Sequence, residues 1–296
     1  MEQIETIKRK IKNAKDMKSV VKTMKTLAAV NIRSYEKAVS SLRKYSHTME
    51  LGFRILFHHK KNLLRRKLEK ELHAENNLII AFGSERGMSG KFNKKAAQYC
   101  HSFIDENGLK DKGTTVLPVG DRIQHRLKDE YLEGERAFPI AGSLKEVVPI
   151  LQKMLIRIDQ MHRKQNLEQI VVVYNTPKSG ASFEATHTYL LPIDRKWLEN
   201  ICRKKWDSRS LPYHRTNWDE LYSILVKEYF FVILYRAFVE SLAAENASRL
   251  ASMQAAENNI EERLDELNSR YNQQRQDSIT NELLDIVSGF EALQEE

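Results

Sequence analysis

The residues best suited to chemistry form a glycine-rich turn, Gly83–Asn93, with the sequence GSERGMSGKFN. A phosphate-binding loop of the type G-x-x-x-x-G-K-[ST] cradles phosphates with backbone N–H groups and places a Ser or Thr hydroxyl on magnesium. Counted back from Gly90, the first glycine of that pattern is replaced by Glu85, and the Ser/Thr position holds Phe92. The turn does not fit G-x-G-x-x-G either. We therefore expect a tight turn after a strand, whose glycines allow close backbone approach, and no bound nucleotide.

The rest of the chain lacks the usual signatures of an active site. There is no HExxH, no GxSxG and no Cys-x-x-Cys pair, and the nine histidines are scattered. The only two cysteines, Cys100 and Cys202, lie far apart, so the sequence predicts no disulfide framework. We expect no catalytic residue, no metal site and no cofactor, and thus a chain that acts through contacts rather than chemistry.

The strongest structural pattern is an apolar stripe near the C-terminus. Its positions are separated alternately by four and three residues, a period of 3.5 that is typical of a helix packed along another helix. A helix that starts near Trp218 would be about 110 Å long at 1.5 Å per residue, too long to lie inside a globular domain. The stripe runs through Asn246, Leu250, Met253, Glu257, Ile260, Leu264, Leu267 and Tyr271, and continues after a stutter at Arg275, Ile279, Leu283, Ile286, Phe290 and Leu293.

The N-terminal segment carries a matching stripe over residues 1–58. Lys18 interrupts this stripe, and we expect the neighbouring Met17 to cover the gap. Residues 1–73 hold 19 Lys/Arg against 7 Asp/Glu, whereas residues 240–296 hold 4 against 13. Two long helices with matching stripes and opposite charge attract one another. The sequence therefore predicts an antiparallel coiled coil of the two ends of the chain.

The middle of the chain has a different pattern, in which short β-rich runs alternate with helical segments. Strands are expected at 77–82, 114–119, 168–175 and 183–191, and helices at about 90–107, 121–131 and 144–164. This order predicts a Rossmann-like α/β domain with a mostly parallel sheet. The predicted domains are 1–73, 74–212 and 213–296. Four aromatic residues at the start of the C-terminal helix are expected to pack where the coil meets the α/β domain: Phe230, Phe231, Tyr235 and Phe238.

Composition narrows the class of protein further. The chain of 296 residues has 30% charged residues and only 11 Gly and 6 Pro, which favours long helices. The longest strongly apolar run, Tyr229–Tyr235, is far shorter than the roughly 20 residues that span a bilayer. We expect a soluble protein that reaches a membrane only through partners. The basic N-terminal face is compatible with nucleic-acid binding, but a solvated face that serves a protein partner is favoured, since no aromatic residues interleave with its first cluster.

Three segments resemble one family. IKRKIKNAKDMKSVVKTMKTLAAVNIR at 7–33 is similar to the opening signature of the gamma subunit of F-type ATP synthases. GSERGMSGKFN resembles that family's central turn GSDRGLCGGFN, and the segments 241–253 and 271–293 resemble its closing signature. The resemblance covers both ends and the middle, so effectively the whole chain.

The resemblance implies a rotor shaft inside a ring of alternating alpha and beta subunits. The α/β domain would sit with the epsilon subunit on the membrane ring of c subunits, at the cytoplasmic face of a bacterial inner membrane. Ion flow would turn the shaft and drive each beta site through its binding states. The resemblance also implies beta-subunit contacts for six residues, which are Arg275, Gln276, Thr280, Met24, Lys25 and Arg249.

The sequence departs from the family at several positions. Asn31 replaces the lysine of its AAAK segment, Ser89 and Lys91 replace a cysteine and a glycine of the central turn, and residues 253–260 replace MDAATKNA of its AMDAATKNA stretch. These departures suggest a divergent bacterial member, of a proton-coupled or an alternative sodium-coupled synthase. Two other classes stay open: a non-rotary coiled-coil adaptor, which would bind no alpha–beta ring, and a nucleic-acid-binding protein with steeply salt-dependent affinity.

Overall fold

The computed structural model describes residues 4–68, 75–110, 112–130, 132, 134–178, 182–204 and 217–294. The chain divides into two compact units. The first, which we call the shaft unit, comprises residues 1–27 and 250–296; the second, the α/β unit, comprises residues 28–249. The domain boundaries expected at residues 73 and 212 lie outside the described residues.

Two long helices pass through both units: α1 (Ile4–Leu68) and α6 (Trp218–Gln294). Neither contains a proline, and α1 continues ten residues beyond the expected end at residue 58. The helices run antiparallel, because Lys18 pairs with Glu261 whereas Lys25, further along α1, pairs with the earlier Glu257. In the α/β unit the same direction appears where the Tyr45 hydroxyl donates to Glu228. The predicted antiparallel packing of the two ends is confirmed.

The inserted sheet has four strands in the order β2-β1-β3-β4. They are β1 (Asn76–Phe82), β2 (Gly113–Val119), β3 (Gln169–Pro177) and β4 (Phe183–Leu191). The first three are parallel, and β4 returns antiparallel to β3. The expected mostly parallel sheet is confirmed, and β4 makes it a mixed sheet. The strands β1 and β3 are buried along most of their length, which is typical of parallel strands covered on both faces.

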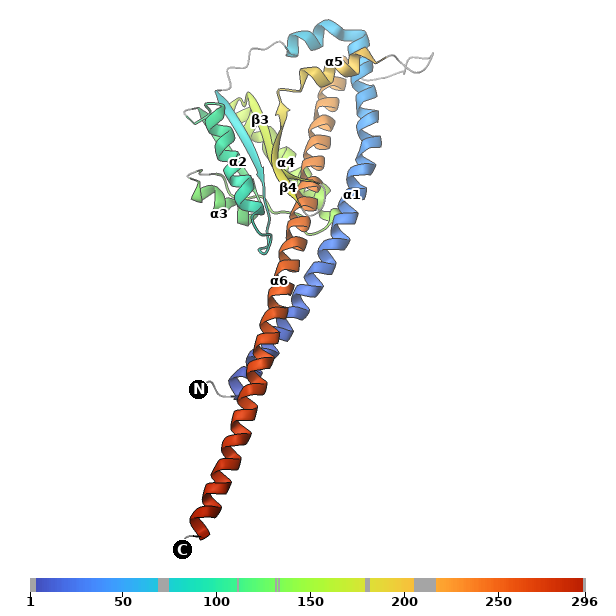
Figure 1. Ribbon diagram of the computed structural model, residues 1–296. Helices are drawn as coiled ribbons and strands as arrows, with labels where there is room; N and C mark the ends of the chain where they lie inside the picture. Colours follow the sequence, from blue (N-terminus) through green and yellow to red (C-terminus); the bar gives the residue numbers. More distant parts are fainter. Residues whose placement is uncertain are drawn as a thin grey trace. The chain divides into compact units, whose positions relative to one another are not determined.

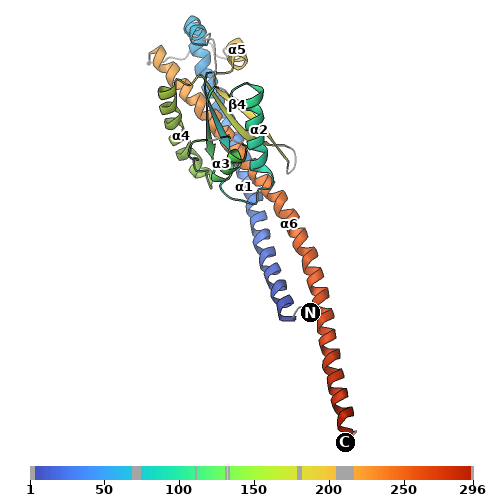
Figure 2. The ribbon, with the colours of Figure 1, turned by 90° about the vertical axis from the view of Figure 1, so that its left-hand side faces the viewer.

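Helices cover both faces of this sheet (Figures 1 and 2). One face packs against α2 (Phe92–Glu106) and α3 (Asp121–Asp129), through Ile79 and Val171 of the strands. The other face packs against α4 (Leu144–Gln165) and the middle of α6. All three inserted helices lie within two residues of their expected positions. The alternation of apolar runs with amphipathic segments was therefore sufficient to predict where these helices lie in the sequence.

The middle of α6 is the apolar bridge between the sheet and α1. Phe238 is fully buried and meets Phe82 of β1 edge-on, with ring centroids 5.1 Å apart. Phe230, Phe231 and Tyr235 are partly buried against the same core, which Tyr35 of α1 completes. The aromatic residues at the start of α6 thus pack where expected.

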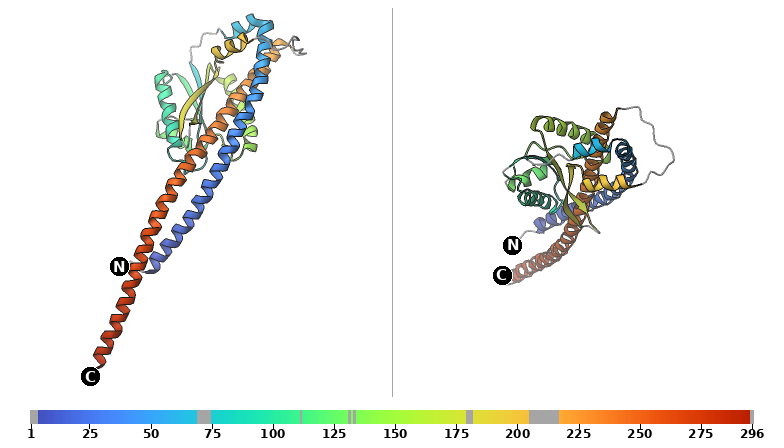
Figure 3. Two further views of the ribbon diagram at one scale, coloured as in Figure 1. Left: turned by 45° about the vertical axis from the view of Figure 1, so that its right-hand side comes forward. Right: turned by 90° about the horizontal axis from the view of Figure 1, so that it is seen from above.

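A short helix, α5 (Arg195–Arg203), follows β4 and was not among the predicted elements. The Asp194 carboxylate caps it by accepting from the Lys196 N–H at 2.8 Å. Figure 3 shows α5 beside α1. Trp197 and Leu198 of its apolar face join Phe53 of α1 in a second core. The sequence signal for this helix was weak, because nine residues make little more than two helical turns and several of them are charged.

Two details of the coil differ from expectation. Met17 is 60% exposed and does not cover the gap at Lys18, whose own side chain occupies the stripe and reaches Glu261. The stripe beyond Tyr271 is not covered, since Ile279 and Leu283 are exposed. Paired residue numbers on α1 and α6 add up to about 280, so Ile4 lies opposite about residue 276. The exposed part of α6 therefore begins opposite the N-terminal end of α1.

Candidate partner-contact surfaces

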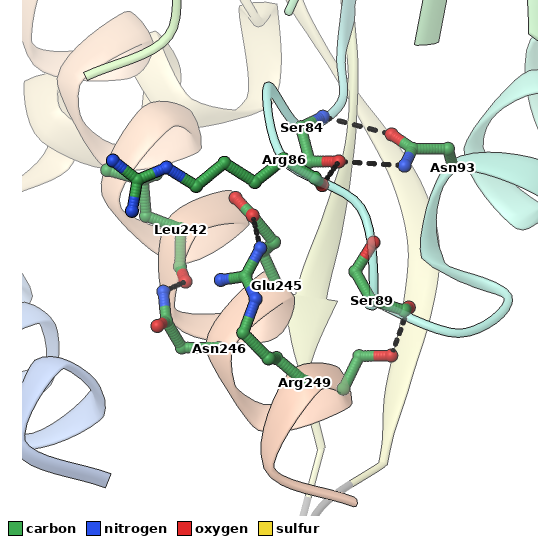
Figure 4. Close-up of polar contacts among 9 residues, drawn as sticks. Ser84, Arg86, Ser89, Asn93, Leu242, Glu245, Asn246 and Arg249 are labelled. Carbon is green, nitrogen blue, oxygen red and sulfur yellow. Dashed lines mark hydrogen bonds and ion pairs between the residues drawn. The ribbon is translucent and has the colours of Figure 1, made fainter. Parts of the chain in front are cut away.

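The glycine-rich turn after β1 is closed by its own hydrogen bonds (Figure 4). The Ser84 N–H donates to Asn93 Oδ1 at 2.9 Å, and Asn93 Nδ2 donates back to Ser84 Oγ at 2.8 Å. Ser84 Oγ in turn donates to the Arg86 carbonyl at 3.0 Å. Close backbone approach occurs at Gly83, where an added Cβ would collide with Ile123. The Ser84 N–H and the polar side chains of Ser84 and Asn93 are thus engaged within the turn.

The same turn is attached to α6. Ser248 Oγ of α6 donates to the Ser89 carbonyl of the turn at 2.7 Å. Nearby, Asn246 Nδ2 donates to the Leu242 carbonyl within α6 at 2.8 Å. Gly90 has φ +56°, which a glycine adopts without strain. Ser89 and Ser248 are both buried. The turn is therefore a docking element for the long helix.

Arg249 lies beside this contact, and its charge is bound within the chain. It forms an ion pair with Glu245 one turn earlier, and the two side chains are 13% and 6% exposed. Burial raises the pKa of Glu245, while the Arg249 charge and hydrogen bond and the nearby Arg86 oppose that rise. Burial, reinforced by Glu245, also raises the pKa of the Tyr35 hydroxyl. The expected contact of Arg249 with a beta subunit stays a prediction, and that contact would compete with Glu245.

Met24 and Lys25 lie in the shaft unit. Met24 is half-buried, and Lys25 pairs with Glu257 across the coil while also donating to Gln254 Oε1 at 3.0 Å. Two cations of the basic N-terminal face, Lys18 and Lys25, are thus held by carboxylates of α6. This use of the lysines favours a protein role of the basic face over nucleic-acid binding.

Arg275, Gln276 and Thr280 are all exposed, at and just beyond the point of α6 that lies opposite the start of α1. Gln276 and Thr280 share a helix face with residues 283 and 287, which follow at helical spacing. The polar residues of the predicted contact therefore continue into exposed apolar ones. The sequence predicted no partner contact for these apolar residues. They are between 47% and 66% exposed, and they are Ile279, Leu283, Leu284, Ile286 and Val287.

This exposed set had a signal in the sequence. The apolar stripe on α6 is longer than the stripe available on α1, so its end needs a different partner. Contiguous exposed apolar surface on a soluble chain marks an interaction site. The structure brings Met24 together with Lys25, and groups the three C-terminal residues, while Arg249 belongs to the α/β unit.

Other chemistry-bearing groups are inert in this arrangement. Burial raises the pKa of the Cys100 thiol to about 12, so it stays protonated. Among the described residues, no three His, Cys, Asp or Glu side chains gather where they could hold a metal ion. Within the same residues, no helix is both long enough and apolar enough to cross a membrane.

The described residues form two long paired helices with an inserted α/β domain, and the class of protein follows from comparison. Comparison with known proteins identifies this class as that of a subunit of ATP synthase. The family model described as ATP synthase matches residues 3–293. The chain therefore belongs to the ATP synthase gamma chain family, whose members are non-catalytic subunits of the complex.

Relatives of full length are distant in sequence. The chain is 25% identical over 300 residues to the ATP synthase gamma chain of Campylobacter jejuni, covering 99% of this chain and 100% of that protein. It is 27% identical over 305 residues to that of Christiangramia forsetii, with 99% of each covered.

Solved structures share the fold. A chain of the Euglena gracilis mitochondrial ATP synthase, solved with F1 and the c-ring, has a TM-score of 0.62 at 19% identity and covers 98% of this chain and 94% of its own. A chain of the central stalk and c-ring of the Tetrahymena thermophila enzyme has a TM-score of 0.56 at 17% identity, with 80% and 99% covered.

Proposed function

We propose that this chain is the central rotor shaft that couples ion flow through a membrane c-ring to ATP synthesis or hydrolysis at beta subunits. The single observation that carries the proposal is the pair of continuous helices, of 65 and 77 residues, that are paired antiparallel within the shaft unit. Helices without an interior proline resist bending, and bending stiffness is what a shaft that transmits torque requires.

The proposed partners follow from the surfaces. The exposed apolar end of α6 would lie within the ring of alpha and beta subunits, with Arg275, Gln276 and Thr280 bonding to a loop of beta. Met24 and Lys25, with Arg249, would face an acidic lever of beta. Exposed ion pairs contribute only about 0–1 kcal/mol, which suits a contact that forms and breaks in every turn.

The α/β unit would rest on the c-ring together with the epsilon subunit. This arrangement would hold the chain at the cytoplasmic face of a bacterial inner membrane, peripherally and through its partners. The c-ring, rather than this chain, selects between protons and sodium ions as the coupling ion.

The test is assembly with the alpha and beta subunits of the same organism, followed by ATPase measurement. We expect one copy of this chain per three alpha–beta pairs, with ATPase activity that depends on its presence. A chain that stays monomeric or self-dimerises, under conditions where another gamma subunit assembles with its own ring, would instead support the adaptor hypothesis.

A further inference from the structure

The apolar seam of the shaft unit is interrupted in the middle. On α6, Met253, Leu264 and Leu267 are buried, but the seam between Met253 and Leu264 holds Glu257 and the half-buried Ile260. Glu257 itself is 9% exposed. A carboxylate therefore occupies a position at which the coil would ordinarily place an aliphatic side chain.

Two ion pairs cross the coil at this interruption. Lys25 pairs with Glu257, whose side chains are 27% and 12% exposed, and Lys25 Nζ also donates to Gln254. One turn further along α6, Lys18 pairs with Glu261 at 2.7 Å, with side chains 36% and 51% exposed. We call Lys18, Lys25, Glu257 and Glu261 the ionic clasp.

The contacts of the clasp favour the charged forms of Glu257 and Lys18. The hydrogen bond from Lys25 lowers the pKa of Glu257, and the charges of Lys18 and Lys22 act in the same direction. The hydrogen bond to Glu261 raises the pKa of Lys18. The two rungs of the clasp differ mainly in exposure, and the Lys25–Glu257 rung is the more buried.

Polar pairs and apolar contacts resist different motions. Apolar burial is nearly non-directional, so helices with a purely apolar seam pack almost equally well after a small slide or roll. A charge-assisted hydrogen bond is directional and is lost after such a movement. For this reason a polar residue in a coiled-coil seam specifies register, at some cost in stability.

We propose that the ionic clasp prevents α1 and α6 from sliding or rolling past each other, so that the two helices carry torque as one element. This inference rests on the proposed rotor function. It also accounts for one departure from the family, because Glu257 occupies the threonine position of the AMDAATKNA stretch and supplies the carboxylate that Lys25 requires.

Two variants separate the clasp from ordinary packing. The apolar variant combines Lys25→Met with Glu257→Leu and completes the apolar seam. The swapped variant combines Lys25→Glu with Glu257→Lys and restores the pair with reversed polarity. A matched control makes the apolar changes at two exposed positions, as Lys15→Met with Glu262→Leu.

The first readout is the distance between spin labels on the isolated chain. Labels at exposed Asp16 and Asn258 report movement of α1 along α6, in a background where Cys100 and Cys202 are replaced by alanine. We expect the apolar variant to unfold no more readily than the wild type, yet to show a distance distribution about twofold broader. The swapped variant and the control should keep the narrow distribution. Equal widths in the apolar variant and the wild type would overturn the clasp, as would a swapped variant as broad as the apolar one.

The second readout is coupling in the assembled complex, measured as ions pumped per ATP hydrolysed. In the complex the same changes are made at the other rung, because Lys25 is proposed to face beta: Lys18→Met with Glu261→Leu as the apolar variant, and Lys18→Glu with Glu261→Lys as the swapped variant. The apolar variant should lose about half of the coupling, and the swapped variant should recover it. Normal coupling in the apolar variant would show that the pair only fills space. If the alpha and beta subunits hydrolyse ATP equally well with and without this chain, the rotor function is contradicted. The spin-label distances would still decide whether the clasp exists.

Discussion

The sharpest prediction concerns Arg249, which the sequence assigns to a partner and the structure assigns to Glu245. The change is Arg249→Ala in the isolated chain. It removes the ion-pair partner that Arg249 provides to a carboxylate whose side chain is 6% exposed. Removing one partner of a buried pair leaves an uncompensated charge and costs about 3–5 kcal/mol of unfolding free energy. A residue that serves only a partner subunit would leave this free energy unchanged.

The pH dependence of the loss identifies its cause. Burial already raises the pKa of Glu245 above its ordinary 4.5, and Arg249 is the first opposing influence. The variant therefore raises that pKa further. A raised carboxyl pKa contributes stability that is complete below the unfolded-state pKa and is lost as the pH rises through the folded-state pKa. The cost of Arg249→Ala should accordingly be small at pH 4 and full at pH 8.

Urea unfolding followed by circular dichroism at both pH values measures this difference. Adding Glu245→Gln should reduce the cost at pH 8 to about 1–3 kcal/mol, the penalty of a buried polar group that has lost a partner, and should remove the pH dependence. Arg263→Ala is the control, since its pair with Glu266 is more than half exposed and should cost less than about 1 kcal/mol. A loss for Arg249→Ala as small as the control's, at every pH, would refute the reasoning.

Three further substitutions test the continuity of α6, the packing of α6 on the sheet and the predicted partner contact near the C-terminal end of α6. Leu264→Pro should cost about 3 kcal/mol or more of helix stability and abolish coupled synthesis; synthesis at the normal rate would exclude the shaft. Phe238→Ala, which removes the ring packed on Phe82, should cost about 3–5 kcal/mol in urea unfolding. Its control Ile224→Ala, at a 45% exposed position of the same helix, should change stability by no more than about 0.5 kcal/mol, and equal losses would contradict the packing argument. Arg275→Ala should weaken assembly with the ring at unchanged helicity of the isolated chain; a large fall in helicity would make the residue structural.

Much of this fold could be read from periodicity. The stripes on α1 and α6 predicted the antiparallel coil because a period of 3.5 has one physical solution, a helix packed along another. The strands β1 and β3 were recognisable because parallel strands buried on both faces are almost wholly apolar. The short α5 was missed since its apolar positions are few, and its stability depends on the core that it shares with Phe53.

Side-chain partners were less predictable than elements. Arg249 and Lys25 both resembled exposed contact residues, yet each is paired with a carboxylate of α6. The i, i+4 spacing of Glu245 and Arg249 was visible in the sequence, but their burial depends on the turn that docks beside them. The Lys25–Glu257 pair joins residues more than two hundred positions apart, so it requires the register of the coil. The local sequence pattern predicts which face of a helix a residue occupies. The tertiary packing of the helices decides which oppositely charged side chain pairs with it.

The position of the glycine-rich turn relates the topology of the sheet to its contacts with α6. In an open α/β sheet, ligands bind at the carboxyl ends of the strands where the strand order reverses. Here that point lies between β1 and β3, and the chain closes it from three sides. Asn93 bonds Ser84, Asn175 at the end of β3 donates to the Phe92 carbonyl at 3.1 Å, and Ser248 of α6 bonds the turn from outside. Within the α/β unit, the side chains of Asn93, Asn175 and Ser248 are thus bonded to residues of the turn. At this edge of the sheet, the turn therefore serves as an attachment point for α6 as well as a connection between β1 and α2.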